Sequence, residues 1–191
     1  MGAAAVLLAA CDSDDEAPGR PRAQTEPTET TRLTPTPACD DGDEPTPEQT
    51  EGPYYTPDTP RRRRITETGV PGDALVVTGL VVATDCKPIR RALLDFWQCD
   101  GDGSYGNEGY RLRGHQFTDA RGRFRLETVR PGLYTGRTRH IHVKVQRPRG
   151  QVLTTQLYFP GEPDNEGDGI FDEALLMDVR GARAAYDFVL A

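Results

Sequence analysis

The stretch from Pro131 to His142, P-G-L-Y-T-G-R-T-R-H-I-H, contains one tyrosine and two histidines within nine positions. Side chains two apart in a β-strand point to the same face, so His140 and His142 project together while Ile141 faces the other way. The strand continues as V-K-V, and its apolar residues can pack into a core while the histidines face a cleft. This is the spacing of two metal ligands, and the alternative is a half-exposed strand with incidental surface histidines.

Short apolar runs separated by turn signals surround this stretch. They predict strands at 75–83, 93–99, 151–159 and 185–190, and a hairpin over 117–126 around the turn D-A-R-G. In the last run Tyr186, Phe188 and Leu190 alternate, as in a closing strand. No convincing amphipathic helix and no internal repeat occur. The pattern indicates an all-β fold, a sandwich or a barrel.

Charge is spread unevenly along the 191 residues, which suffice for one domain and some appended sequence. The net charge is -7, and residues 11–51 carry 12 acidic and 3 basic side chains, so the remainder has a balance of about +2. Arg61–Arg64 is the one basic run, which is more typical of a solvated loop than of a binding site. The missing basic patch argues against a nucleic-acid-binding protein.

The amino-terminal residues Met1–Ala10 are small and apolar and are followed by Cys11, in the sequence L-A-A-C. This run is shorter than the roughly 20 residues of a membrane span. Residues 1–11 resemble the end of a bacterial lipoprotein signal, in which the cysteine is lipidated. Because a basic region is missing, we expect the true start upstream of Met1, with a twin-arginine signal as one export route. The alternative is a chance Ala-rich start.

Residues 12–44 are acidic and rich in Thr and Pro, and they contain almost no large apolar side chains. Such a segment cannot bury enough surface to offset its ordering entropy, so it predicts a flexible tether. About thirty flexible residues reach roughly 30 Å. We therefore expect a folded domain at 45–191, exported to the bacterial cell envelope or beyond and held at a membrane through the lipid on Cys11.

Three cysteines remain after lipidation of Cys11, and three leave one unpaired. If the strands on either side of Cys86 form a hairpin, Cys86 lies at its turn and Cys99 at its far end, too far apart for a direct bridge. A bond from Cys39 to either one is the alternative.

Tyr105, in the Gly- and Asp-rich loop D-G-D-G-S-Y-G-N, is the fourth residue that we assign to one site, with Tyr134, His140 and His142. A phenolate oxygen is a hard, anionic ligand that suits a trivalent cation, whereas zinc sites usually use Cys, His and carboxylates. Two phenolates and two neutral imidazoles neutralise much of the charge of Fe(III). The set therefore predicts a non-haem ferric site.

Other aromatic and histidine residues stay outside this assignment. Tyr54 and Tyr55 either cap the core or line a pocket, and composition favours the core. Trp97 is assigned to packing. His115, in R-G-H-Q-F-T-D, matches no ligand position.

The chain resembles the intradiol ring-cleavage dioxygenases over nearly all of residues 45–191, especially their secreted, single-domain members. The resemblance rests on T-P-E-Q-T-E-G-P-Y-Y, W-Q-C-D-G-D-G-S-Y, T-D-A-R-G-R-F, P-G-L-Y-T-G-R-T-R-H-I-H-V-K-V and Q-L-Y-F-P-G. Prealbumin-like sandwich modules without metal share the T-D-x-x-G-x-F and P-G-x-Y pattern, in which Tyr134 would be a core tyrosine. Tyr105 and the H-x-H motif distinguish the dioxygenases from these metal-free modules.

The resemblance implies a single prealbumin-like β-sandwich that binds non-haem Fe(III). In the family, O2 inserts between the two hydroxyl-bearing carbons of a catechol to give a muconate-type diacid. By resemblance, Tyr105 and His140 would be equatorial ligands and Tyr134 and His142 axial ones. Tyr134 would be displaced by the substrate and accept a proton from it.

Two further residues match the family's active site. Arg137 would stabilise negative charge on the substrate, and Gln156 would lie near the oxygen-binding region; the alternatives are a surface arginine and a glutamine satisfied by backbone.

Residues before 45 leave no room for the helical dimerisation region of the catechol 1,2-dioxygenases, so oligomeric state stays open. The alternative function is an extracellular β-sandwich binding module with a non-catalytic metal site.

Overall fold

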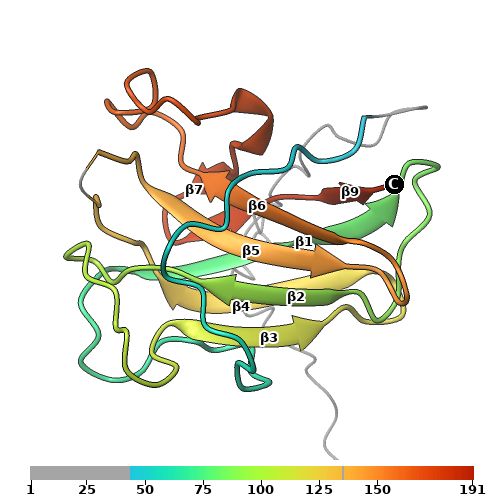
Figure 1. The fold of residues 1–191 in the computed structure, drawn as a ribbon, viewed down its shortest axis with the longest axis horizontal. Coiled ribbons are helices and arrows are strands. Elements are labelled where there is room, and N and C mark those ends of the chain that lie inside the picture. The colour runs from blue at the N-terminus through green and yellow to red at the C-terminus, as the bar shows by residue number, and fades with distance from the viewer. Residues whose placement is uncertain (1–43, 135) are drawn as a thin grey trace, which may run out of the picture. The chain divides into compact units, whose positions relative to one another are not determined.

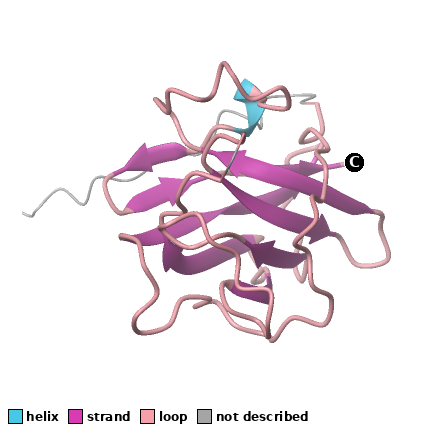
Figure 2. Cartoon of the chain, turned by 60° about the vertical axis from the view of Figure 1, so that its left-hand side comes forward, coloured by secondary structure: helices cyan, strands magenta, loops and turns pink. Residues whose placement is uncertain are grey.

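The computed structural model describes residues 44–134 and 136–191, which form two β-sheets and one short 3-10 helix (Figures 1 and 2). In chain order the elements are β1 (Ala74–Ala83), β2 (Leu93–Trp97), β3 (Arg113–Phe117), β4 (Arg123–Val129), β5 (His140–Gln146), β6 (Val152–Tyr158), η1 (Glu173–Leu175), β7 (Asp178–Arg180), β8 (Arg183–Ala185) and β9 (Phe188–Leu190). One sheet has the order β3-β2-β5-β6, and the other has the order β4-β1-β8-β7 with β9 also paired to β1. The predicted all-β sandwich is confirmed.

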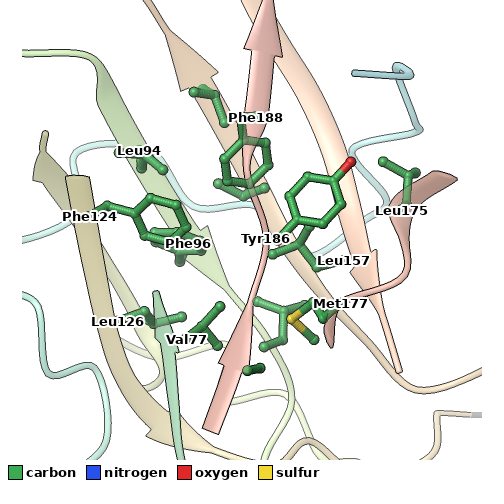
Figure 3. Packing of buried hydrophobic residues seen from close by; sticks show 14 of the residues in the cluster. Val77, Leu94, Phe96, Phe124, Leu126, Leu157, Leu175, Met177, Tyr186 and Phe188 are labelled. Carbon is green, nitrogen blue, oxygen red and sulfur yellow. The ribbon is translucent and has the colours of Figure 1, made fainter. Parts of the chain in front are cut away.

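The core consists of side chains that both sheets bury between them (Figure 3). Leu94 and Phe96 on β2 and Phe124 on β4 belong to it, and the rings of Phe96 and Phe124 lie 5.9 Å apart between centroids. Phe188 on β9 packs against Phe124 at 5.6 Å. The predicted strands thus bury their apolar residues in one shared core.

Strand β5 is buried on both of its faces. Ile141, Val143 and Val145 are fully buried in the core, and His140 and His142 point to the opposite, outer face of the β3-β2-β5-β6 sheet. In the ladder His142 is paired with Trp97 on β2 and with Gln156 on β6. The predicted alternation along this strand is confirmed.

The outer face of this sheet is covered by residues 49–62, here called the strap. Near its start, the Gln49 amide donates to the Thr154 carbonyl on β6 at 2.8 Å. Further on, the Arg62 amide donates to the His115 carbonyl on β3 at 2.9 Å. Since β6 and β3 are the two edges of the sheet, the strap crosses the whole face between them (Figure 1). It shields the histidines from water.

The hairpin predicted over 117–126 is wrong. The turn itself forms, because the Asp119 amide donates to the Arg123 carbonyl at 3.0 Å and the Asp119 carboxylate accepts from the Arg121 amide at 2.8 Å. However, β3 pairs with β2 whereas β4 pairs with β1, in the other sheet. A local turn signal fixes the reversal of the chain but not the partners of the strands that follow it.

The closing strand predicted at 185–190 is divided in two. Both β8 and β9 run parallel to β1. Between them, the Asp187 carboxylate accepts the Leu80 amide at 2.7 Å in place of a backbone carbonyl. Tyr186, Phe188 and Leu190 are buried as the alternation predicts, and so is Val189, which is 1% exposed.

The structure gives the state of two cysteines, Cys86 and Cys99, for which disulfide pairings were predicted. Cys86 is disulfide-bonded and Cys99 is a buried free thiol, so the two are not joined to each other. Cys11, Cys39 and the predicted signal and tether, up to residue 43, lie outside the described residues. Within residues 44–134 and 136–191, no helix has the length and apolar character needed to cross a membrane.

We expect Gly79→Ala to lower the free energy of unfolding by roughly 1–3 kcal/mol, the usual cost of overpacking. A Cβ atom at Gly79 would lie 1.7 Å from the Tyr186 carbonyl oxygen, so β1 and the segment between β8 and β9 would have to separate. Urea unfolding measures the change. Gly169→Ala is the control, since its Cβ would meet no atom within 4 Å. Equal midpoints for both variants would contradict this packing.

Candidate metal centre

The structure brings the four predicted ligands together on the outer face of the β3-β2-β5-β6 sheet. His140 and His142 come from β5, Tyr134 from the loop before it, and Tyr105 from the loop between β2 and β3. Ring centroids lie 4.7 Å apart for the two histidines, 5.8 Å for the two tyrosines and 6.5 Å for Tyr105 and His142. Residues from three separate parts of the chain therefore form one cluster.

The two histidines point the same ring nitrogen at each other. The Nδ1 of His140 lies 2.6 Å from the Thr138 carbonyl, which only accepts, so this nitrogen carries the proton and Nε2 carries the lone pair. The Nε2 atoms of His140 and His142 lie 3.1 Å apart. Two imidazole nitrogens bound at right angles to one metal at about 2.1 Å would be about 3.0 Å apart. The spacing fits two neighbouring ligands of one ion.

His142 is held chiefly by ring packing. Its imidazole stacks on the Trp97 indole, with centroids 4.8 Å apart and planes 7° from parallel. On another side lies Gly52 of the strap, where a Cβ would be 3.3 Å from the His142 Cε1 atom. Its Nδ1 is buried and has no hydrogen-bond partner in the part of the chain that the structure describes. Trp97, predicted to serve packing, therefore also fixes the plane of this ring.

Burial keeps both histidines neutral. Desolvation is the main cause that lowers the pKa of His140 to about 4; the Thr138 carbonyl and Asp168 act against this shift, and Arg137 acts with it. Desolvation, the neighbouring His140 and Arg137 hold the pKa of His142 well below its ordinary value. A metal ligand must be deprotonated, so both imidazoles are in the binding form at neutral pH.

Tyr105 has a buried hydroxyl with no hydrogen-bond partner among the described residues. An unsatisfied buried polar group costs about 1–3 kcal/mol. Burial also raises the pKa of this phenol, so it ionises at neutral pH only beside a cation. Within the described residues no three His, Cys, Asp or Glu side chains gather as a metal site, so a metal bound here would require the tyrosines.

Arg137 is fixed beside the cluster. Its Nε donates to Asp168 Oδ2 at 2.9 Å and its Nη2 to Gln156 Oε1 at 2.6 Å. The same Asp168 oxygen accepts the Thr138 amide at 3.0 Å, and the Thr138 carbonyl in turn accepts from His140. Arg137 is therefore tied into the network that orients a ligand, which an ordinary surface arginine would not be.

Gln156 has both ends of its amide engaged. Its oxygen accepts from Arg137, and its nitrogen donates to the Thr50 carbonyl of the strap at 3.0 Å. A cavity of about 440 Å³ lies on the Tyr134 and Arg137 side of the cluster, and neither Gln156 nor the other three predicted ligands line it. Its lining residues are Leu133, Tyr134, Gly136, Arg137, Thr138, Asp164, Gly167 and Asp168. Two predicted site residues, Tyr134 and Arg137, thus face an open space, whereas Gln156 orients Arg137.

Two further residues lie at the centre. Tyr54, for which the sequence left both a core and a pocket position open, lies among the tyrosines, with its hydroxyl 3.1 Å from that of Tyr134. Arg113 is fully buried and donates to the Tyr54 carbonyl at 3.0 Å. The G-P-Y-Y motif was the available signal for Tyr54, and nothing local marked Arg113. His115 lies on β3 with Nδ1 2.7 Å from the Thr59 carbonyl, outside the cluster as expected.

Comparisons with known proteins place the chain among dioxygenases. A family model described as Dioxygenase matches residues 50–190. The chain is 35% identical over 118 residues to the protocatechuate 3,4-dioxygenase beta chain of Burkholderia cepacia, covering 52% of this chain and 50% of the relative. It is 30% identical over 148 residues to the catechol 1,2-dioxygenase of Candida albicans, covering 63% and 49%. The chain thus spans about half the length of these curated relatives.

Solved structures share the fold. The dioxygenase domain of a dioxygenase carbohydrate-binding protein fusion from Streptomyces sp. SirexAA-E is 56% identical with a TM-score of 0.75, covering 77% of this chain and 98% of that one. The 3-chlorocatechol 1,2-dioxygenase of Rhodococcus opacus 1CP is 27% identical with a TM-score of 0.69, covering 75% and 71%. The family model alone spans well over half of the sequence. The chain belongs to the intradiol ring-cleavage dioxygenase family.

Proposed function

We propose that this protein is a non-haem Fe(III)-dependent intradiol dioxygenase that inserts O2 between the two hydroxyl-bearing carbons of a small catechol. The product would be a muconate-type diacid. The observation that carries the proposal is the convergence of two phenols on two imidazoles whose Nε2 atoms lie 3.1 Å apart. A prealbumin-like module that binds no metal would have no need of such a buried cluster.

The proposed ligands are Tyr105, Tyr134, His140 and His142, and they suit ferric iron. Two anionic phenolates balance much of the charge of a trivalent ion, and the neutral imidazoles add no positive charge. When bound, the iron would supply Lewis acidity that activates a catecholate toward O2. The buried, unpartnered Tyr105 hydroxyl supports this assignment, because coordination would satisfy it.

The substrate would enter the cavity beside Tyr134 and Arg137. Its volume of about 440 Å³ exceeds the roughly 150 Å³ cavity that holds a benzene molecule, so a substituted ring fits. Relatives of this chain are named for catechol, protocatechuate, hydroxyquinol and chlorocatechol. We therefore propose a catechol as the substrate class and leave its substituents open.

Two residues would act on the substrate directly. Tyr134 is half-buried at the edge of the cavity, where its phenol oxygen is placed to take up a proton from a substrate hydroxyl. Arg137 is held by Asp168 and Gln156, so its guanidinium is oriented before the substrate arrives. A fixed positive charge at the cavity wall would stabilise negative charge that develops on the ring during cleavage.

We propose that Cys11 is lipidated and that residues 12–44 tether the domain to the cell envelope. An oxidising location suits the disulfide at Cys86.

Iron loading tests the ligand set. The iron-loaded protein should be red to brown from tyrosinate-to-Fe(III) charge transfer, and adding catechol should shift the band and start O2 uptake. Tyr105→Phe should lose most of the colour and the activity while remaining folded, because it removes a phenolate ligand. Tyr110→Phe is the control, since Tyr110 lies in the same loop but is 37% exposed.

The outcomes separate the alternatives. Wild-type protein that stays colourless after iron loading under air would overturn the iron site. Coloured protein that never consumes O2 with any catechol would favour the non-catalytic binding module. An unchanged spectrum in Tyr105→Phe would remove Tyr105 from the ligands.

Arg137→Lys should lower kcat by roughly 10²- to 10³-fold, the usual loss when one preorganised charge-stabilising donor is removed. Lysine keeps the charge but cannot make both contacts, to Asp168 and Gln156, in the geometry of a planar guanidinium. Steady-state O2 uptake with catechol measures the effect, and the iron spectrum should keep its intensity. The control is Arg149→Lys, in the exposed turn between β5 and β6. Wild-type kcat in Arg137→Lys would rule out the proposed role.

Mass spectrometry of the protein from its native host should find Cys11 as a lipidated amino terminus. The reason is the L-A-A-C sequence, whose cysteine would become the first residue after cleavage. An unmodified Met1 on a cytoplasmic protein would contradict both the anchor and the export route.

A further inference from the structure

Tyr54 of the strap contacts both of the proposed phenol ligands at once. Its ring stacks on Tyr105 with centroids 4.2 Å apart and planes 17° from parallel. Its hydroxyl lies 3.1 Å from the Tyr134 hydroxyl, within hydrogen-bond distance. The rings of Tyr54 and Tyr134 also meet edge to face at 5.6 Å. One side chain therefore links two residues that come from different loops.

The backbone behind Tyr54 is fixed by Arg113. The guanidinium donates to the Tyr54 carbonyl at 3.0 Å and, through its other terminal nitrogen, to the Arg111 carbonyl at 2.9 Å and the Gly106 carbonyl. Gly106 directly follows Tyr105, so the buried Arg113 joins the strap to the loop that carries the ligand. The stack of Tyr54 on Tyr105 is thus anchored through both of its backbones.

We propose that Tyr54 is a positioning residue of the metal centre that donates a hydrogen bond to the Tyr134 oxygen and orients the Tyr105 ring. The proposal rests on the proposed function, because it takes both tyrosines as iron ligands. An ionised Tyr134 oxygen can only accept, so the Tyr54 hydroxyl must be the donor in that state. The bond would withdraw electron density from the Tyr134 phenolate and hold its ring in place.

A purely structural role makes a different prediction. If Tyr54 served only to cover the sheet, its hydroxyl would matter little and its ring would account for any effect. Removal of the hydroxyl alone distinguishes the two, because Tyr54→Phe keeps the stack on Tyr105 and deletes only the contact with Tyr134. Since Tyr54 is half-buried and loses a single oxygen, the variant should fold normally.

Tyr54→Phe should move the tyrosinate-to-Fe(III) band to longer wavelength, because a phenolate without the hydrogen bond is easier to oxidise. It should also weaken iron binding by roughly 10- to 100-fold, as is usual when a group supporting a metal ligand is lost. Tyr54→Leu removes the stack as well and should weaken iron binding further. Band position and iron affinity are measured by titrating the metal-free protein with ferric iron, without substrate.

Tyr55→Phe is the matched control. Tyr55 is the next residue of the strap, but its hydroxyl donates to Asp95 Oδ2 at 3.2 Å and its ring packs on Trp97. The control should keep the wild-type band, and the melting temperatures of both Phe variants should show that they are folded.

The results also separate this inference from the proposed function. If wild-type protein binds iron and Tyr105→Phe loses the colour, an unchanged band and affinity in Tyr54→Phe would overturn the role of Tyr54 alone. An equal red shift in Tyr55→Phe would likewise overturn it, since the effect would then not arise at Tyr134. Failure of the wild type to develop colour would overturn the proposed function and this inference with it.

Discussion

Alternation along β5 is the constraint on which the rest of the structure depends. Because neighbouring side chains of a strand point to opposite faces, Ile141, Val143 and Val145 fill the core while His140 and His142 face outward. A shift of register by one residue would bury the histidines among apolar side chains and expose the core positions. The packing that stabilises the sandwich therefore also fixes the direction of two of the proposed ligands.

The outer face of a sheet is normally solvated, and here it becomes a buried site only because other segments cover it. The strap runs over it between β6 and β3, and the loop between β2 and β3 brings in Tyr105. Exclusion of water has two effects: it keeps the histidines neutral, and it makes an isolated phenol costly to ionise. A trivalent cation bound there would offset the cost of ionising the buried phenol. The covering segments are in this way linked to the proposed chemistry.

The sequence predicted what depends on short-range pattern and could not predict what depends on distant contacts. The H-I-H alternation, Tyr134 in P-G-L-Y and the loop tyrosine Tyr105, read together with the family resemblance, named four residues that the fold brings together. For Tyr54 a core position and a pocket position both stayed open, because composition alone cannot show which loop a strap residue will meet. Arg113 was missed for the same reason, since its role comes from carbonyls on two segments far apart in sequence. The sequence also could not predict which strands pair. The turn at 119–122 looked like that of a hairpin, although the strands on either side of it belong to different sheets.

A crystal structure of the iron-loaded protein, with anomalous scattering collected on both sides of the iron absorption edge, tests the ligand set most directly. We expect a single iron peak within about 2.3 Å of the Tyr105 and Tyr134 oxygens and of the Nε2 atoms of His140 and His142, in line with the usual metal-ligand distances. Full iron occupancy at any other place, or a peak bound by the histidines but out of reach of Tyr105, would contradict it.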